Sequence, residues 1–140
     1  MKITSRWVDG RCFIASNELG NSVVMEGAAD DSATRRGASP MEMLLMGVAG
    51  CSSIDVVDIA HKQRQKVTDC ITTVSAERAD SIPKVFTKIH IHFKVLGHDL
   101  KENSIAKAVQ LSAEKYCSAS IMLSKAAEIT HSFEVGDAAE

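Results

Sequence analysis

Two of the four cysteines, Cys51 and Cys117, lie in sequence surroundings that could make a thiol reactive. Cys51 follows Gly47, Ala49 and Gly50, so small side chains leave room for a substrate or another backbone to approach the sulfur. Glycine inside a helix costs about 1 kcal/mol relative to alanine, which indicates a packing or functional need for both glycines. The alternative interpretation of Cys51 is a small buried core residue, and its surroundings taken alone favour that one.

Cys117 directly precedes a predicted helix start at Ser118. A thiol ahead of a helix N-terminus lies near unpaired N–H groups and the positive end of the helix dipole, and both lower its pKa. A buried turn residue is an equally good interpretation of this position. Cys12 and Cys70 lie in strand-like segments without charged or capping neighbours, so we interpret both as inert packing residues.

The spacing of potential metal ligands does not match a common metal motif. None of the cysteines belongs to a C-x-x-C pair, so we expect free thiols in a reducing compartment rather than a zinc finger or a disulfide scaffold. His90 and His92 form an H-x-H that can supply two ligands, but no acidic or cysteine residue lies near them in sequence. We expect solvent-facing or interface histidines there, and we expect neither a metal nor an organic cofactor.

The composition is that of an ordinary soluble globular protein. The chain has 140 residues, of which 45% are hydrophobic and 24% charged, which predicts one domain over residues 1–140. A formal net charge of −2 gives no sign of a nucleic-acid partner. No apolar run reaches the roughly 18 residues of a membrane span, and Met1–Arg6 lacks the apolar core of a secretory signal. We therefore expect a cytoplasmic protein with no membrane partner.

Short strands followed by one long helix are predicted for the first half of the chain. Strands over residues 2–8 and 11–16 flank the hairpin signal Asp9-Gly10, and a third strand spans 21–26 before a loop over 27–38. Ser39-Pro40-Met41-Glu42 has the spacing of a capping box with proline at the first helical position. Helical spacing then continues to about Gln65.

The first half of this helix, residues 43–51, is apolar or small on every side. A helix that is hydrophobic all round must be buried. The remaining elements of one subunit barely suffice to enclose it, so we expect a second subunit to supply part of the cover, most simply in a two-fold dimer. A well-wrapped monomer is the alternative.

The second half predicts two long strands, two helices and a closing strand. The strands span 67–77 and 84–95, the helices 99–115 and 118–127, the last strand 129–135, and a frayed tail 136–140. Apolar and polar residues alternate along the strand over 84–95, which predicts a sheet with one solvent-exposed face. Its predicted apolar face comprises Val85, Ile89, Ile91, Phe93 and Val95, and its polar face Lys84, Lys88, His90, His92 and Lys94. The element order is βββ-α-ββ-αα-β, an α+β fold.

The segments around Cys51 and Cys117 resemble the two cysteine motifs of the OsmC/Ohr family. Ser39 to Cys51 has the proline, acidic residue, apolar run, small pair and cysteine of the first motif. Lys115 to Ser120, followed by residues 125–135, has the cysteine, nearby serine, helix and final strand of the second. The element order resembles that family's fold over nearly the whole chain. The resemblance implies an intertwined homodimer with central buried helices and two active sites near the subunit interface.

The resemblance also implies thiol peroxidase chemistry in oxidative-stress defence. In the family, the cysteine matching Cys51 attacks an organic hydroperoxide and the cysteine matching Cys117 resolves the product. A dithiol reductant, often a lipoamide-bearing protein, then restores both thiols. A sulfenic acid condenses with a neighbouring thiol to a disulfide, which requires the two Cα atoms to lie within about 7 Å.

The family's better-known peroxidases activate the first cysteine with an arginine held by a glutamate directly after the proline. Here Met41 and Val8 stand at the two corresponding positions, and the acidic residue is Glu42. Arg35 and Arg36, just before the helix, and Arg11, after the hairpin, are replacement cations that would favour a Cys51 thiolate from within about 4–6 Å. The candidate catalytic residues are therefore Cys51, Cys117, Glu42, Arg36 and Arg35.

Two other functions remain open from the sequence. A non-catalytic dimer could bind a small apolar ligand, with thiols that are vestigial or act as a redox sensor, and the missing arginine–glutamate pair favours that alternative. Thiol chemistry on a persulfide or an activated acyl substrate would use the same cysteines.

Overall fold

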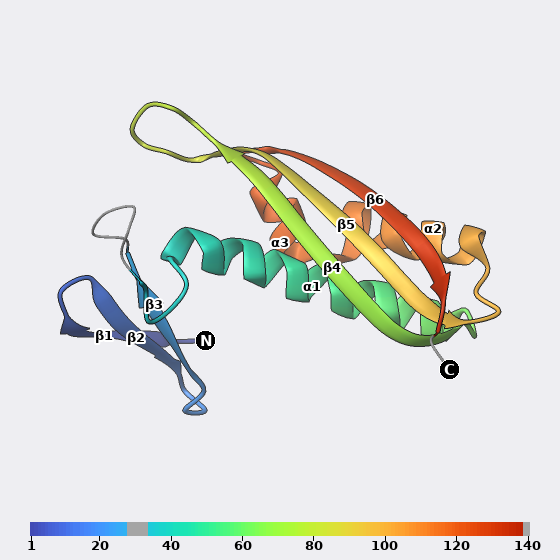
Figure 1. The fold of residues 1–140 in the computed structure, drawn as a ribbon, viewed down its shortest axis with the longest axis horizontal. Helices are drawn as coiled ribbons and strands as arrows, with labels where there is room; N and C mark the ends of the chain where they lie inside the picture. Colours follow the sequence, from blue (N-terminus) through green and yellow to red (C-terminus); the bar gives the residue numbers. More distant parts are fainter. Residues whose placement is uncertain (28–33, 139–140) are drawn as a thin grey trace. The chain divides into compact units, whose positions relative to one another are not determined.

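The computed structural model describes residues 1–27 and 34–138, which form two compact units divided after Leu45. The long helix α1 (Pro40–Lys62) begins in the first unit and continues into the second. Figure 1 shows the elements of both units in chain order.

The first unit contains a three-stranded antiparallel sheet. Its strands are β1 (Ile3–Asp9), β2 (Cys12–Asn17) and β3 (Ser22–Glu26), in the order β1-β2-β3. Gly10 in the β1–β2 turn has a φ of 45°, in the left-handed region that glycine adopts without steric cost. The three predicted strands are confirmed to within one residue at each end. Every residue of β1 is exposed within the chain.

The start of α1 has the predicted capping box. The Ser39 hydroxyl accepts a hydrogen bond from the Glu42 backbone N–H at 3.2 Å, and the Glu42 carboxylate accepts one from the Ser39 N–H at 2.6 Å. The helix ends at Lys62, three residues before the predicted end, because the chain turns at Arg64 with a φ of 58°. Of the predicted loop over 27–38, residues 28–33 lie outside the described residues.

The second unit packs helices on one face of a second three-stranded sheet (Figure 1). The strand order is β4-β5-β6, with β4 (Lys66–Arg78) antiparallel and β6 (Glu128–Asp137) parallel to the central β5 (Phe86–His98). The helices are α2 (Glu102–Leu111), α3 (Ser118–Leu123) and the larger part of α1. The buried core includes Ile89, Ile91, Phe93 and Val95 of β5, Val48 and Val56 of α1, and Ile105 of α2. The α+β class and the element order are therefore confirmed.

Three details of the second unit differ from the sequence prediction. Val85 does not belong to the buried face: it is 46% exposed, and Phe86 is buried instead. The register between β4 and β5 shifts between Glu77 and Arg78, so simple alternation fails at that end of β5. The α3 helix ends at Leu123 rather than near residue 127, and residues 136 and 137 belong to β6 rather than to a tail.

The other residues that the structure describes do not enclose α1. Val48, Ser52, Val56 and Ala60 form its buried stripe, whereas Ile54 is 64% exposed. The sheet and the other helices cover only one stripe of α1, in line with the expectation that one subunit does not enclose this helix, and the well-wrapped monomer is not supported. Cover by a second subunit stays a prediction. By length and composition α1 would also suffice to cross a membrane, a test that core helices of soluble proteins pass as well.

Candidate functional site

The direction of Cys51 is set by the two serines that follow it on α1. The Ser52 hydroxyl donates a hydrogen bond to the Val48 carbonyl at 2.7 Å, inside the buried stripe. The Ser53 hydroxyl donates to the Ala49 carbonyl at 2.6 Å and, with its proton used there, accepts from the Thr72 hydroxyl of β4 at 2.7 Å. The Ser53–Thr72 bond crosses from α1 to β4 and helps to set the rotation of the helix against the sheet, and with it the position of the Cys51 sulfur.

Cys117 lies where the polypeptide leaves one helix and enters the next. A single π-helical turn, Ser112–Tyr116, ends in a hydrogen bond from the Cys117 N–H to the Ser112 carbonyl at 2.9 Å. The Cys117 sulfur then caps α3 by accepting a hydrogen bond from the Ser120 N–H at 3.4 Å. Such π turns occur frequently at functional sites, and this one brings a cap sulfur over α1.

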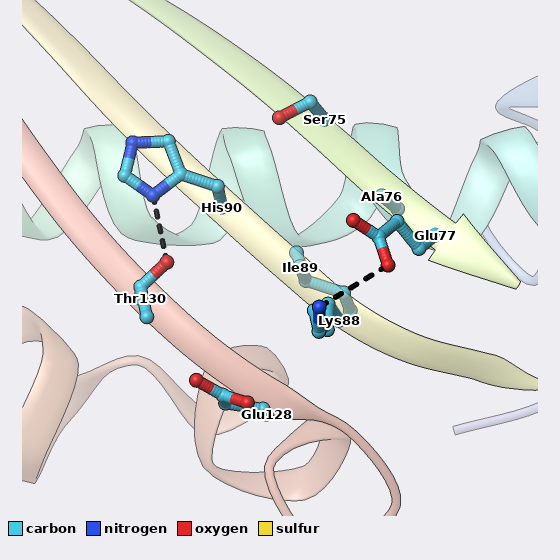
Figure 2. Close-up of a pocket in the computed structure, with 8 residues that line it drawn as sticks. All are labelled: Ser75, Ala76, Glu77, Lys88, Ile89, His90, Glu128 and Thr130. Atoms are coloured by element: carbon cyan, nitrogen blue, oxygen red, sulfur yellow. Dashed lines mark hydrogen bonds and ion pairs between the residues drawn. The ribbon is translucent and has the colours of Figure 1, made fainter.

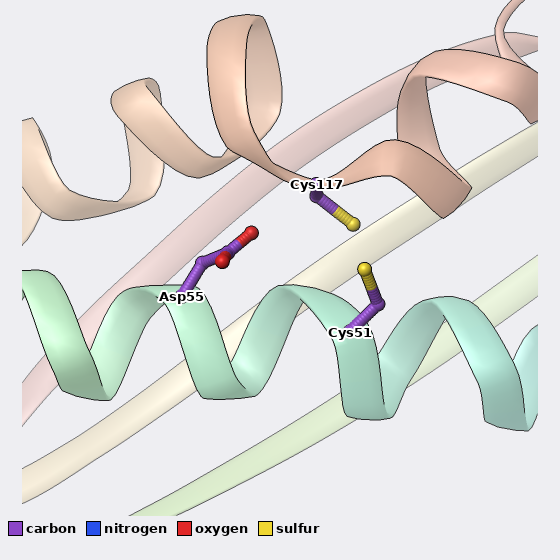
Figure 3. A group of neighbouring side chains, drawn as sticks. All are labelled: Cys51, Asp55 and Cys117. Carbon is purple, nitrogen blue, oxygen red and sulfur yellow. The ribbon is translucent and has the colours of Figure 1, made fainter.

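The structure brings Cys51 and Cys117 together with a third residue, Asp55. The two sulfurs and one carboxylate oxygen of Asp55 all lie within 4.8 Å of one another. Figure 3 shows the sulfurs pointing toward each other, with Asp55 one helical turn beyond Cys51 on α1. Cys117 is fully buried, and Cys51 and Asp55 are half-buried. The Ser112 hydroxyl donates to the Asp55 carboxylate at 3.3 Å.

Asp55 was not among the residues that the sequence singled out. Asp55 could have been found from its spacing, because it lies four residues after Cys51 and the two side chains therefore share one helix face.

The Cys117 thiol has an unusually high pKa. Burial raises this pKa to about 12, the neighbouring Cys51 thiol and Asp55 carboxylate add to the increase, and the Ser120 N–H partly opposes it. The helix terminus does lower this pKa through the Ser120 N–H, as expected, but burial outweighs it, so the expected net lowering is wrong and the buried turn residue is the better interpretation. One N–H donor at the start of a six-residue helix does not compensate for the loss of water around a charged sulfur. Cys117 is consequently a protonated thiol at neutral pH.

In the first unit, Arg35 and Glu42 form an arginine–glutamate pair. The guanidinium donates two hydrogen bonds to the carboxylate, at 2.7 and 3.0 Å. Together with the Ser39 N–H, this pairing lowers the pKa of Glu42 to about 2. Glu42 therefore caps α1 and holds Arg35 at the same time, as a carboxylate at all physiological pH values.

Arg36 has different partners in the same unit. Its guanidinium is bound by the carboxylates of both Asp9 and Glu26, and its backbone N–H also donates to Glu26 at 2.7 Å. These bonds raise the pKa of Arg36 and lower that of both carboxyl groups. Arg36 thus ties the first hairpin and β3 to the segment before α1.

The H-x-H pair lies on the open face of the second sheet and is hydrogen-bonded to hydroxyl groups. His90 contacts the Thr130 hydroxyl through Nδ1 at 2.7 Å and the Ser132 hydroxyl through Nε2 at 2.8 Å, and His92 Nδ1 shares Ser132 at 2.8 Å. Figure 2 shows the first of these bonds beside the Lys88–Glu77 ion pair, in a pocket of about 250 Å³. Both ring nitrogens of His90 are therefore hydrogen-bonded to hydroxyl groups, and their arrangement needs no metal ion to explain it.

Comparison with known proteins identifies the family. The family model described as OsmC-like protein matches residues 29–132. Protein YhfA of Escherichia coli K12 is 48% identical over 135 residues, covering 96% of this chain and 98% of that protein. The crystal structure of a hypothetical protein from Aquifex aeolicus is 28% identical with a TM-score of 0.86, covering 99% of this chain and 97% of that one.

The organic hydroperoxide resistance protein OhrB of Bacillus subtilis shares the fold. It superposes with a TM-score of 0.66 at 19% identity, over 95% of this chain and 96% of that one. With a family match over most of its length and a curated relative at 48% identity, the chain belongs to the OsmC family.

Proposed function

We propose that this protein is a thiol-dependent peroxidase that reduces organic hydroperoxides, of the alkyl or lipid class, through a two-cysteine cycle. The observation that carries the proposal is the approach of the Cys51 and Cys117 sulfurs to within 4.8 Å of each other. Membership of the OsmC family and the fold shared with an organic hydroperoxide resistance protein support a stress-related, peroxidase-like role.

The proposed cycle needs no electrons beyond those of thiols. The Cys51 thiolate attacks the terminal oxygen of the hydroperoxide, the O–O bond breaks, and the leaving alkoxide takes up a proton from water, equivalent to the one that Cys51 lost on ionisation. The products are an alcohol and a Cys51 sulfenic acid. The Cys117 sulfur then attacks the Cys51 sulfur, and its proton leaves with the hydroxyl group as water. An external dithiol reduces the resulting disulfide and becomes a disulfide itself.

The different environments of the two sulfurs support this division of roles. Half-buried Cys51 is the sulfur that a substrate reaches, whereas Cys117 is sealed from solvent. The raised pKa keeps the proton on Cys117 until the sulfenic acid forms, and that proton is needed to release water. A disulfide bond is about 2.05 Å long, so the sulfurs close by less than 3 Å when it forms.

We propose Arg35 as the cation that activates Cys51, with Glu42 as the residue that holds it. The bidentate pair has the residue types that the family uses for this purpose. Arg36 is a weaker candidate because two carboxylates already neutralise it. If Arg35 has this role, Arg35→Ala slows the reaction with peroxide several-fold or more without changing the number of thiols finally consumed.

We further propose that the working form is a cytoplasmic homodimer, regenerated by a dithiol reductant such as a lipoamide-bearing protein. Free thiols at all four cysteines agree with a reducing compartment. The exposed apolar residues of α1 and of the first sheet support the dimer.

A stoichiometric titration with cumene hydroperoxide and subsequent thiol counting tests the peroxidase. The wild-type protein should lose two thiols for each peroxide consumed, and Cys51→Ser should consume none. Cys117→Ser should turn over once and stop at a sulfenic acid that dimedone traps. Cys70→Ser is the matched control and should behave as wild type. Folded wild-type protein that loses no thiols would reject the peroxidase in favour of a ligand-binding module.

A further inference from the structure

Three side chains that ligate metals converge between α1 and the start of α3. We propose that the reduced Cys51–Asp55–Cys117 cluster is a binding site for a thiophilic divalent cation of the Zn²⁺ class. This inference goes beyond the proposed peroxidase and does not depend on turnover of any peroxide. It concerns what the cluster binds while both thiols are reduced.

The donor set suits zinc. Two soft thiolate sulfurs and one carboxylate oxygen favour the borderline-soft ion Zn²⁺ over Mg²⁺ or Ca²⁺, which prefer oxygen ligands alone. With Zn–S bonds of about 2.3 Å and tetrahedral angles, the two sulfurs would lie about 3.8 Å apart. The three donor atoms already lie within 4.8 Å of one another, so side-chain shifts on the order of 1 Å complete the geometry. Three protein ligands leave the fourth position for water.

The charges of the cluster also favour a cation. Asp55 and the two thiols carry negative charge when ionised, and their donor atoms lie within 4.8 Å of one another. A divalent cation balances these charges: two metal–sulfur bonds form, and the thiol protons still bound are released. The three ionised ligands carry a charge of −3 together, and the divalent ion reduces the net charge of the cluster to −1.

The surroundings of the ligands add orientation and access. The Ser112 hydroxyl, which donates to the Asp55 carboxylate at 3.3 Å, is the kind of outer partner that fixes a ligating carboxylate. Cys51 and Asp55 project from consecutive turns of one helix, and Cys117 is held by its own cap bond. Half-buried Cys51 and Asp55 give an ion a route to buried Cys117.

Titration of the reduced full-length protein with Co²⁺ and Zn²⁺ tests the site. Co²⁺ should produce thiolate-to-metal charge-transfer absorption at one ion per chain, and Zn²⁺ should displace it. Calorimetry in two buffers should show proton release on binding, because coordination displaces the thiol proton of Cys117. Competition with a chromophoric chelator gives the affinity for Zn²⁺.

Paired variants separate the site from adventitious binding. Cys51→Ala and Cys117→Ser should abolish the charge-transfer signal, and Asp55→Asn should weaken Zn²⁺ binding at least tenfold. Asp58→Asn, an exposed carboxylate three residues further along α1, and Cys70→Ser should both bind as wild type. Cys117 is buried, so its substitution could disturb folding. The Cys51 and Asp55 variants change half-buried positions and therefore still test the site if the Cys117 variant misfolds.

Reduced wild-type protein without one-to-one binding, binding that survives Cys51→Ala, or an unchanged affinity in Asp55→Asn would each overturn the three-ligand site. Peroxide consumption measured in excess chelator reports separately on the proposed function. A protein that consumes peroxide but binds no Zn²⁺ rejects only the metal site, and one that binds Zn²⁺ but ignores peroxide rejects only the peroxidase.

Discussion

At the scale of single residues, Cys117 illustrates how burial can outweigh a favourable helix terminus. Its pKa is raised to about 12 by burial first and by Cys51 and Asp55 second. We therefore expect the ultraviolet thiolate absorbance of Cys117, taken as the difference between wild type and Cys117→Ser, to be still rising at pH 10, whereas that of an ordinary thiol levels off above its pKa of about 8.5. An absorbance titration of the folded proteins measures this without a reagent having to reach the buried sulfur.

Asp55→Asn provides the matching variant for this prediction. Removing a negative charge beside the sulfur lowers the pKa of Cys117, so the thiolate absorbance should rise at lower pH. Asp58→Asn should leave the absorbance profile in place. A plateau of the wild-type absorbance below pH 9 would contradict the raised pKa.

His131 should make the stability of the fold depend on pH. Its ring stacks on Phe93, and its Nε2 is buried without a hydrogen-bond partner among the residues that the structure describes. Burial, and secondarily His90, lowers the pKa of His131 below its usual 6.5. The unfolded chain therefore takes up a proton that the folded chain resists, and stability falls as pH drops from 6.5 through the lowered pKa.

Replacing this side chain by an uncharged ring removes the effect. His131→Phe should lose less free energy of unfolding than wild type between pH 7 and pH 5. Urea unfolding followed by circular dichroism at several pH values measures the difference. Equal pH slopes for the two proteins would show that His131 does not contribute.

At the scale of elements, the capping box should contribute measurably to the stability of α1. Ser39→Ala removes the hydroxyl that accepts the Glu42 N–H, and losing such a cap costs about 1 kcal/mol. Ser81→Ala in the exposed β4–β5 loop should change stability by less than about 0.5 kcal/mol. The two urea midpoints give the comparison, and equal values would show that Glu42 alone sustains the helix start.

Elements with local signals were predictable from the sequence. The first hairpin and the capping box at Ser39 depend on neighbouring residues, and both are confirmed, although the turn lies at Gly10-Arg11, one residue later than the predicted Asp9-Gly10. The sequence did not predict that Phe86 rather than Val85 lies on the buried face, because this follows from a register shift of β5 against β4. A shift of this kind depends on the partner strand, which the local alternation does not contain.

The same distinction applies to the candidate site. Sequence motifs singled out Cys51, Cys117, Arg35 and Glu42, but which of them meet depends on tertiary structure. Asp55 was not predicted as a site residue, because a single aspartate on a helix gives no signal until the fold brings a second thiol close to it. The sign of the Cys117 pKa shift also depends on burial, which the position before a helix does not reveal.

At the scale of the whole molecule, the exposed apolar residues support a dimer. Ile54 of α1 is 64% exposed and Trp7 of β1 is 66% exposed. A methyl group added at Gly47 or Gly50 would meet no atom within 4 Å, so this face of α1 is open within the chain. Large exposed apolar side chains on an open helix face are typical of a protein–protein contact, which favours a second copy as the cover of α1.

We therefore expect light scattering to give twice the chain mass of 15.1 kDa. Ile54→Glu places a charge on the open face of α1 and should shift the protein toward monomer, with a Tm that falls on dilution more steeply than that of wild type. Ile82→Glu, at a loop position that is 90% exposed, is the matched control and should remain dimeric. A folded wild-type species of single-chain mass at every concentration would mean that α1 is stable with its apolar face in water, and the proposed dimer would then fail.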